Sequence, residues 1–201
     1  MSQVNLEDRE LTNERLELGS GTTYFLGPNL TLKNCTLVLK VSSRSLIVPQ
    51  ARFIDCTLDV RKELKGFRWE HAIFKSCRFT GRLRGNDFGR WPDSLGAQGG
   101  IEDCDFTGAH LDGCRFIGCD TRTLRFPEWP CFTLLDPGQR WREWSAVAWP
   151  GDIGRVVIRG FEEYPPLTVA VTYSAPDLAK RSGTTPEAIK ATLQHLDGVK
   201  Y

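Results

Sequence analysis

Large apolar residues recur at every fifth position of residues 101–121, and a small residue stands two positions before most of them. This spacing is neither the 3.6-residue period of a helix nor the two-residue period of a strand. A chain that turns a corner about every five residues would point both kinds of residue inward, and four corners would close one coil. The large residues are Ile101, Phe106, Leu111 and Phe116, and the small ones are Cys104, Ala109 and Cys114.

The same pattern recurs upstream with a period of 21 residues, and several columns share that register. A fixed period of this length is typical of a solenoid, in which each coil buries its apolar face against its neighbours. We therefore predict about five coils, at residues 11–27, 28–48, 49–69, 70–90 and 99–121. The predicted core ladder comprises Cys35, Cys56, Cys77, Cys104, Cys114, Leu37, Leu58, Phe79, Phe106 and Phe116.

The repeat resembles that of the pentapeptide-repeat family, whose unit is a small residue, any residue, a large Leu or Phe, and two polar residues. The match is strict over residues 101–121 and covers two pentads per coil at residues 30–37, 51–58 and 72–79. The resemblance implies a mainly β protein, a right-handed, quadrilateral parallel β-helix of about 21 residues per coil. Such a fold indicates no activity by itself.

The net charge and the hydropathy of the chain bear on whether its partner is a nucleic acid, a membrane or a protein. The chain has 26 Lys and Arg against 25 Asp and Glu, so its global charge argues against nucleic acid or a membrane surface. The first residues are hydrophilic, and no apolar run is long enough to span a bilayer. We expect a cytoplasmic protein, with the acidic segment 7–17 at the N-terminal end of the solenoid, where charges protect the open sheet edges.

The period breaks between the fourth and fifth coils, which predicts an inserted loop within residues 81–100 of a solenoid domain at residues 1–121. Insertions in solenoids emerge on one face, often the binding face. Arginine and tryptophan are enriched at interface hot spots. The alternative is that the inserted segment is an ordinary glycine-rich loop that binds no partner. The candidate partner-binding residues are Arg82, Arg84, Asp87, Arg90 and Trp91.

Charge is segregated along the predicted axis. Residues 61–90 carry nine basic side chains against three acidic ones, whereas residues 101–121 carry five acids against Arg115 alone. This distribution would steer a charged partner or would let neighbouring coils neutralise each other. The basic middle coils argue against a continuous acidic face of the kind that mimics DNA.

Residues 122–201 differ in composition from the repeats and are predicted to form a small α+β cap. Four of the six tryptophans and many prolines lie there, which suits a segment folded over the last coil. An exposed aromatic patch for a partner is the alternative. Two strands are predicted, at residues 155–159 and 167–173.

A C-terminal helix pair is predicted after those strands. Pro176 and Pro186 stand near the first positions of the two helices and Gly183 ends the first. The pair has a faint likeness to a helix-turn-helix, but a DNA reader needs a third helix and a basic recognition helix. We expect the pair to pack on the flank of the solenoid.

Seven cysteines permit a metal hypothesis, in which Cys114 and Cys119 would bind zinc with Cys104 or His110. No second closely spaced pair completes such a site, and the cysteines occupy the small inward position of the pentad. An odd count in a cytoplasmic chain also argues against disulfides. We predict core packing, with no metal and no cofactor.

Enzymatic motifs are absent from the sequence: no nucleophile elbow, phosphate loop, dinucleotide fingerprint or zinc-protease motif occurs. Some pectin-cleaving enzymes are parallel β-helices with acids on one face, but a narrow packed prism offers no groove for such acids. The acids available for that arrangement are Asp55, Asp59, Asp103 and Asp105. We predict no catalytic residues.

A rigid surface that is ordered before association suits a binding protein. The leading hypothesis is a bacterial immunity-type inhibitor that neutralises a cognate toxin by direct binding. The family resemblance supports a second hypothesis, a topoisomerase-protecting protein that mimics DNA. A purely structural scaffold is the third. The oligomeric state, monomer or dimer, is left open.

Overall fold

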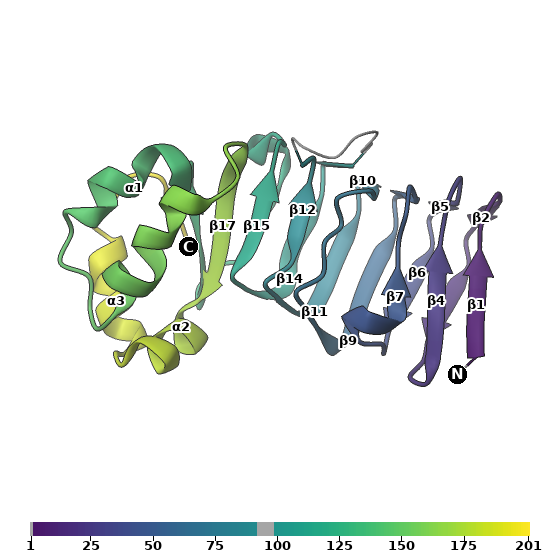
Figure 1. Ribbon diagram of the computed structural model, residues 1–201, viewed down its shortest axis with the longest axis horizontal. Helices are drawn as coiled ribbons and strands as arrows, with labels where there is room; N and C mark the ends of the chain where they lie inside the picture. The colour runs from purple at the N-terminus through teal and green to yellow at the C-terminus, as the bar shows by residue number, and fades with distance from the viewer. Residues whose placement is uncertain (1, 92–98) are drawn as a thin grey trace.

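Stacked parallel strands make up most of the molecule. The computed structural model describes residues 2–91 and 99–201. Figure 1 shows an elongated molecule, with strand β1 at one end and helices α1, α2 and α3 at the other. Three parallel sheets run along the long axis, in the orders β1-β4-β7, β2-β5-β8-β10-β13 and β3-β6-β9-β11-β14. A fourth sheet, β12-β15-β17-β16-β18, lies at the C-terminal end.

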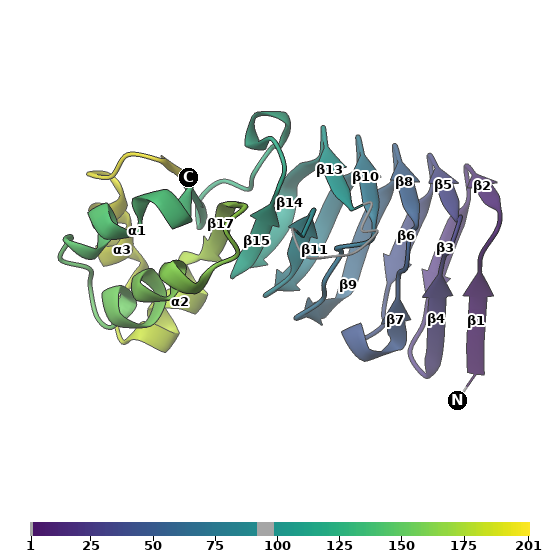
Figure 2. The same ribbon diagram turned by 45° about the horizontal axis from the view of Figure 1, so that its top comes forward.

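Most strands of the three parallel sheets have three to five residues, and β9, β11 and β14 are longer. The first sheet holds β1 (Ser2–Leu6), β4 (Thr22–Leu26) and β7 (Leu46–Ile47). The second, whose strands lie side by side in Figure 2, holds β2 (Glu10–Thr12), β5 (Thr31–Lys33), β8 (Arg52–Ile54), β10 (Ile73–Lys75) and β13 (Gly100–Glu102). The third holds β3 (Arg15–Leu18), β6 (Thr36–Leu39), β9 (Thr57–Lys65), β11 (Arg78–Arg84) and β14 (Asp105–Asp112).

The strand register confirms the predicted coil length of 21 residues. In the second sheet Leu11 pairs with Leu32, Leu32 with Phe53, and Phe53 with Phe74. In the third, Leu16 pairs with Leu37 and Leu37 with Leu58. The chain is therefore a parallel β-helix whose apolar columns stack inward from coil to coil.

A ladder of left-handed residues forms one corner. Asn, Asp and Ser tolerate a positive φ better than other non-glycine residues because they hydrogen-bond locally. The side-chain amide of Asn34 donates to Oδ1 of Asn13 at 2.7 Å, which joins two coils at this corner. The ladder consists of Asn13, Asn34, Asp55, Ser76 and Asp103, with φ between 49° and 61°.

The predicted core ladder is buried inside the coils. The rings of Phe79 and Phe106 stack with centroids 4.4 Å apart, and Phe88 and Phe116 stack at 5.4 Å. Each thiol of the column donates to backbone carbonyls instead of forming a disulfide; Cys56, for example, donates to the carbonyl oxygen of Leu32 at 3.3 Å. Burial raises the pKa of the Cys35 thiol and raises that of Cys114 to about 12, so both stay protonated donors.

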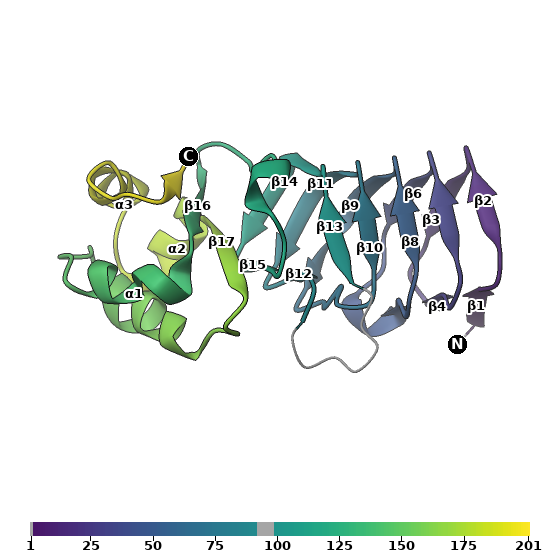
Figure 3. The same cartoon turned by 90° about the horizontal axis from the view of Figure 1, so that it is seen from above.

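Residues 122–201 build a second core against the end of the solenoid (Figure 3). Strand β17 (Thr168–Ser174) pairs antiparallel with β15 (Cys114–Ile117), and β15 pairs parallel with β12 (Asp87–Gly89). Strands β16 (Cys131–Leu135) and β18 (Val199–Lys200) complete this sheet. Helices α1 (Pro137–Ser145), α2 (Ala175–Ser182) and α3 (Pro186–Leu193) lie beyond it, with short helical turns at Ser43–Ser45 (η1), Thr121–Thr123 (η2), Gly154–Ile158 (η3) and Arg159–Glu163 (η4).

Three details differ from the predictions. Residues 155–159 are not a strand but lie in the helical turns η3 and η4. The inserted loop does not span residues 81–100, because β11 and β12 continue the coil through Gly89; its part at residues 92–98 lies outside the described residues. Finally, the N-terminal end begins one strand earlier than predicted, at β1, which pairs with β4. Among the described residues, no helix combines the length and the apolar character needed to cross a membrane.

Candidate binding pocket

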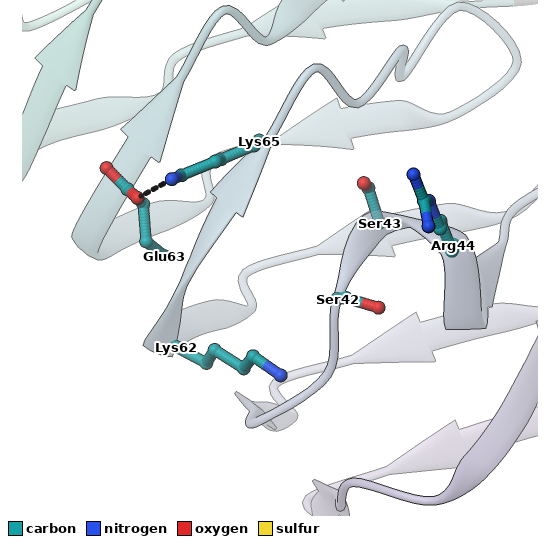
Figure 4. Close-up of a pocket in the computed structure, with 6 residues that line it drawn as sticks. All are labelled: Ser42, Ser43, Arg44, Lys62, Glu63 and Lys65. Carbon is teal, nitrogen blue, oxygen red and sulfur yellow. Dashed lines mark ion pairs between the residues drawn. The ribbon is translucent and has the colours of Figure 1, made fainter.

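An open pocket of about 600 Å³ lies on the solenoid surface between two neighbouring coils (Figure 4). One wall is the turn η1 and the residue before it, which supply Ser42, Ser43 and Arg44. The other wall is the end of β9, which supplies Lys62, Glu63 and Lys65. In Figure 4 the Lys62 side chain extends from its strand toward the loop that carries Ser42. The volume falls within the roughly 300–1,000 Å³ typical of ligand sites.

The pocket exists because two adjacent coils depart from the five-residue pattern at the same corner. Strand β6 ends at Leu39, whose partner on the next coil is Val60. Strand β9 runs on to Lys65, while the preceding coil turns away into η1. Buried Val41 and Leu46 anchor that turn on either side. The two chain segments therefore diverge after Val60 and leave a hollow between them.

The pocket walls carry more positive than negative charge. Three cations line the pocket against one carboxylate, Glu63, and that carboxylate accepts an ion pair from Lys65 Nζ at 2.9 Å. Glu63 also faces Arg82 Nε at 4.0 Å. Within the described residues, Arg44 and Lys62 make no ion pair, so their charges face solvent. With two serine hydroxyls beside them, the walls suit an anionic group.

The sequence-predicted residue Asp87 is engaged within the molecule. Only 4% of Asp87 is exposed, and Arg115 donates to both its carboxylate oxygens, at 2.7 and 2.9 Å. This bidentate contact raises the pKa of Arg115 above its ordinary value. The guanidinium carbons of Arg68 and Arg115 lie 4.9 and 5.6 Å from the ring centroid of Trp91. Asp87 and Trp91 therefore hold Arg115, which in turn lies 5.2 Å from the ring centroid of Tyr164 in the C-terminal part.

Arg82 and Arg84 also contact acids of the molecule itself. Arg82 Nη2 lies 3.3 Å from Asp177 Oδ2 on helix α2, and Arg84 Nε lies 3.5 Å from Asp112 Oδ2. Arg181, also on α2, donates to both oxygens of Asp112, at 2.7 and 3.0 Å. Of the five predicted partner-binding residues, Arg82, Arg84 and Arg90 have exposed side chains, and Arg90 makes no ion pair within the described residues. The structure thus brings four of the five to internal ion pairs and cation–π contacts.

The pocket residues were not predicted from the sequence, because the longest break in its period lies elsewhere. Two weaker irregularities mark the pocket: the run Ser42-Ser43-Arg44-Ser45, and the run Arg61-Lys62-Glu63-Leu64-Lys65 one coil later. Each interrupts the five-residue spacing at the same corner. Two breaks one period apart indicate adjacent surface features, and this juxtaposition is readable in the sequence alone.

The residues of the metal hypothesis are kept apart by other contacts. Cys104 and Cys114 are buried donors to backbone carbonyls, of Glu102 at 3.2 Å and of Leu83 at 3.3 Å. His110 Nε2 lies 2.7 Å from Asp177 Oδ2. In residues 2–91 and 99–201, no three His, Cys, Asp or Glu side chains gather in a way that would hold a metal ion.

Comparison with known proteins adds little to this geometry. No protein-family model matches the chain, and no curated protein matches its sequence. Two trypsin-treated variants of QnrB1, a plasmid-mediated fluoroquinolone resistance protein, are similar solved structures. The first is 20% identical over 58% of this chain, with a TM-score of 0.22; the second is 15% identical over 62%, with a TM-score of 0.25. The alignments cover 46% and 71% of the QnrB1 chains, so this chain spans about half the length of the first.

Proposed function

We propose that this chain is a non-enzymatic, protein-binding solenoid of the pentapeptide-repeat type, and that its partner docks at the pocket between η1 and β9. The β-helix is held by continuous strand pairing and a packed core, so its surface is ordered before the partner arrives. Binding to such a surface costs little conformational entropy.

The pairing of charges along the solenoid carries this proposal. Charged side chains on adjacent coils meet each other: Glu10 with Lys33 at 2.8 Å, Glu17 with Lys40 at 2.8 Å, and Lys75 with Glu102 at 3.6 Å. These contacts favour the interpretation that charges on neighbouring coils neutralise each other. They argue against a charge distribution that steers a charged partner to the whole solenoid. The pocket departs from this pattern because it brings together two cations, Arg44 and Lys62, that have no acidic counterpart among the described residues; Arg52, which also lacks one, lies at another hollow of the solenoid.

The finer proposal is an immunity-type inhibitor, which would bind a cognate toxin in equal numbers. A small, preformed solenoid with a local basic hollow suits a protein that blocks another by contact alone. The topoisomerase-protecting hypothesis is supported by the stacked pentad columns, the feature that carries the family resemblance. DNA mimicry, however, needs a continuous acidic face, and the acids here are interleaved with arginines and lysines.

Affinity purification of the tagged chain at native level from its own cell, with mass spectrometry of what co-purifies, tests the proposal. One equimolar protein with a toxin-like domain is expected, and its toxicity should be suppressed when the two are expressed together. Recovery of a type II topoisomerase, with a change in its supercoiling activity on addition of the pure chain, would select the second hypothesis. A chain that repeatedly purifies without any partner would leave only the scaffold hypothesis.

A variant that removes partner binding without disturbing the fold would distinguish a binding protein from a structural scaffold. Replacing Arg82, Arg84, Arg90 and Trp91 together tests partner binding poorly, because most of these side chains hold the molecule together. Charge reversal at Arg44 and Lys62 is the sharper change, since neither side chain contributes an internal ion pair within the described residues.

A further inference from the structure

A free strand edge borders the pocket. On one side, β9 pairs with β11 at Val60 and again at Leu64 and Lys65, and the register shifts across residues 61–63 between them. On the other side, its pairing with β6 ends at Val60, opposite Leu39. Within the described chain, no strand pairs with residues 61–65 on that second side. A short stretch of β9 therefore presents one unpaired edge to the pocket.

Such an edge is a template for another strand. Extended peptides add to exposed sheet edges through main-chain hydrogen bonds, and side chains at alternate positions supply the specificity. Proteins commonly protect an edge with charges, particularly lysine. Here Lys62 and Lys65 lie on the edge strand, and Arg44 lies on η1 at the other wall of the pocket. These cations would oppose a neutral or basic strand and attract an acidic one.

Resting on the proposed function, we propose that the pocket binds an extended acidic segment of the protein partner. The segment adds as a strand to the edge of β9 at residues 61–65. Its carboxylates, at alternate positions, pair with Arg44 and Lys62 and accept hydrogen bonds from the serine hydroxyls. Lys65 stays paired with Glu63, so the two solvent-facing cations set the charge preference.

A peptide fits this pocket better than a nucleic acid does. Single-stranded nucleic acid is held by a basic groove with aromatic rings on which bases stack. The six residues that line the pocket include no aromatic side chain. Several cations of the coils around the pocket are paired with acids, such as Arg61 with Asp59 and Arg78 with Asp105, and these acids interrupt a basic track along the described solenoid surface. A strand edge, by contrast, presents a row of backbone donors and acceptors that matches another extended backbone.

A short labelled peptide of alternating glutamate and threonine is the probe, with the intact chain and fluorescence anisotropy as the readout. The wild-type chain is expected to bind it, more weakly as salt increases. Arg44→Glu with Lys62→Glu should weaken binding by about tenfold or more, because two attractions become repulsions. Lys180→Glu, an exposed cation on helix α2, is the matched control and should bind like wild type. The same peptide N-methylated at alternate amides should also bind at least several-fold more weakly.

Three results would overturn the proposal: no binding of the peptide at low salt, equal binding by the double variant, or no effect of N-methylation. Equal binding by an oligonucleotide of the same charge would assign the pocket to nucleic acid instead. Full displacement by inorganic phosphate at low concentration would assign it to a free anion.

The outcome is separable from that of the proposed function. If native purification of the wild-type chain recovers a partner that the double variant retains equally well, the proposal for the pocket is wrong while protein binding stands. If no partner is recovered with either chain, the proposed function is wrong, whatever the peptide does.

Discussion

Buried carboxylates join the solenoid to the C-terminal core. Asp112 is 3% exposed and accepts two hydrogen bonds from Arg181, while Arg84 lies 3.5 Å away. Asp87 pairs with Arg115 between two solenoid strands, and the guanidinium carbon of Arg115 lies 5.2 Å from the ring centroid of Tyr164 in the C-terminal part. A buried charge is tolerated only when its partners replace the lost water. These two sites therefore fix how the C-terminal core sits on the coils.

Asp112→Ala should destabilise the protein by about 2–3 kcal/mol. Loss of one partner of a buried ion pair typically costs about 3–5 kcal/mol, and the cost is reduced here because 30% of the Arg181 side chain already reaches solvent. Chemical denaturation monitored by tryptophan fluorescence measures the change. Asp152→Ala removes a pair with the exposed Arg155 and should leave the midpoint almost unchanged. Equal midpoints for wild type and Asp112→Ala would show that the pair contributes no net stability.

Asp177 on helix α2 contacts His110 on β14, and this contact should make the free energy of unfolding depend on pH in the acid range. The hydrogen bond from His110 is the main reason that the pKa of Asp177 lies below its ordinary value. A lowered pKa in the folded state stabilises the fold above the unfolded-state pKa of about 3.9 and ceases to do so as pH falls through the folded value. Asp177→Asn should therefore lower the free energy of unfolding at pH 6, with the deficit shrinking below about pH 4. A deficit of constant size down to pH 2 would contradict this origin.

At the scale of residues, the sequence indicates which side chains face inward but not which polar groups meet. The core ladder follows from spacing alone, since a small and a large residue at fixed offsets must stack in a coil of constant length. Arg82 and Asp177 are 95 residues apart in the chain, and no periodicity links them. From the sequence alone, an arginine that forms an ion pair within the molecule cannot be distinguished from one that is available to bind a partner.

At the scale of elements, Gly81 allows the coils to stay in close contact where β9 and β11 lose their common register. Val60 pairs with Gly81, but Leu64 pairs with Leu83, so β9 carries two more residues than β11 between these pairs. Gly81 has φ +86°, and a Cβ atom there would lie 2.0 Å from the carbonyl oxygen of Val60. Only glycine combines that dihedral angle with that approach.

Gly81→Ala should cost more than about 2 kcal/mol, because strain in φ adds to the overlap with the Val60 backbone. Gly100→Ala is the matched control: Gly100 is also a strand residue, and a methyl group added there would meet no atom within 4 Å. Thermal unfolding followed by circular dichroism compares the two. If both variants melt together, the close approach at Gly81 is not a constraint on the fold.

The one predicted strand that proves helical shows how context overrides propensity. The run Val156-Val157-Ile158 is β-branched and typical of a strand. In the structure Val157 and Ile158 are buried in the core that also contains Trp144. A helical turn lets both be buried in that core, whereas a strand would point one of them away. The sequence could not predict this, because the indole that receives them comes from another element.

At the scale of the whole molecule, β17 belongs to both cores. Ala170 packs in the solenoid core, whereas its neighbours Val171 and Tyr173 pack in the C-terminal core. Because successive side chains of a strand point to opposite faces, β17 can pack against the solenoid core with one face and against the C-terminal core with the other. The backbone of Arg125 adds a second closure, accepting from Phe106 N at 2.8 Å and donating to Cys104 O at 3.0 Å. Together these segments pair the edge of β15 and the start of β14, whereas β13 ends its sheet within the described residues.

Removal of residues 122–201 should therefore make the solenoid self-associate. Without β17, the edge of β15 and its buried Phe116 and Ile117 face solvent, and an unpaired apolar edge templates pairing with another chain. Size-exclusion chromatography with light scattering should show larger species than the intact chain forms, while circular dichroism retains the β signal.

Ile117→Lys in the shortened chain distinguishes edge pairing from general unfolding. A lysine on the exposed edge disfavours another strand, so this variant should return a substantial part of the material to the size of a single shortened chain. Unfolding would leave the lysine variant as aggregated as its parent, with the β signal lost in both. A shortened chain that stays dispersed with its β structure intact would show that the coils end stably by themselves, and that residues 122–201 serve a purpose other than closure.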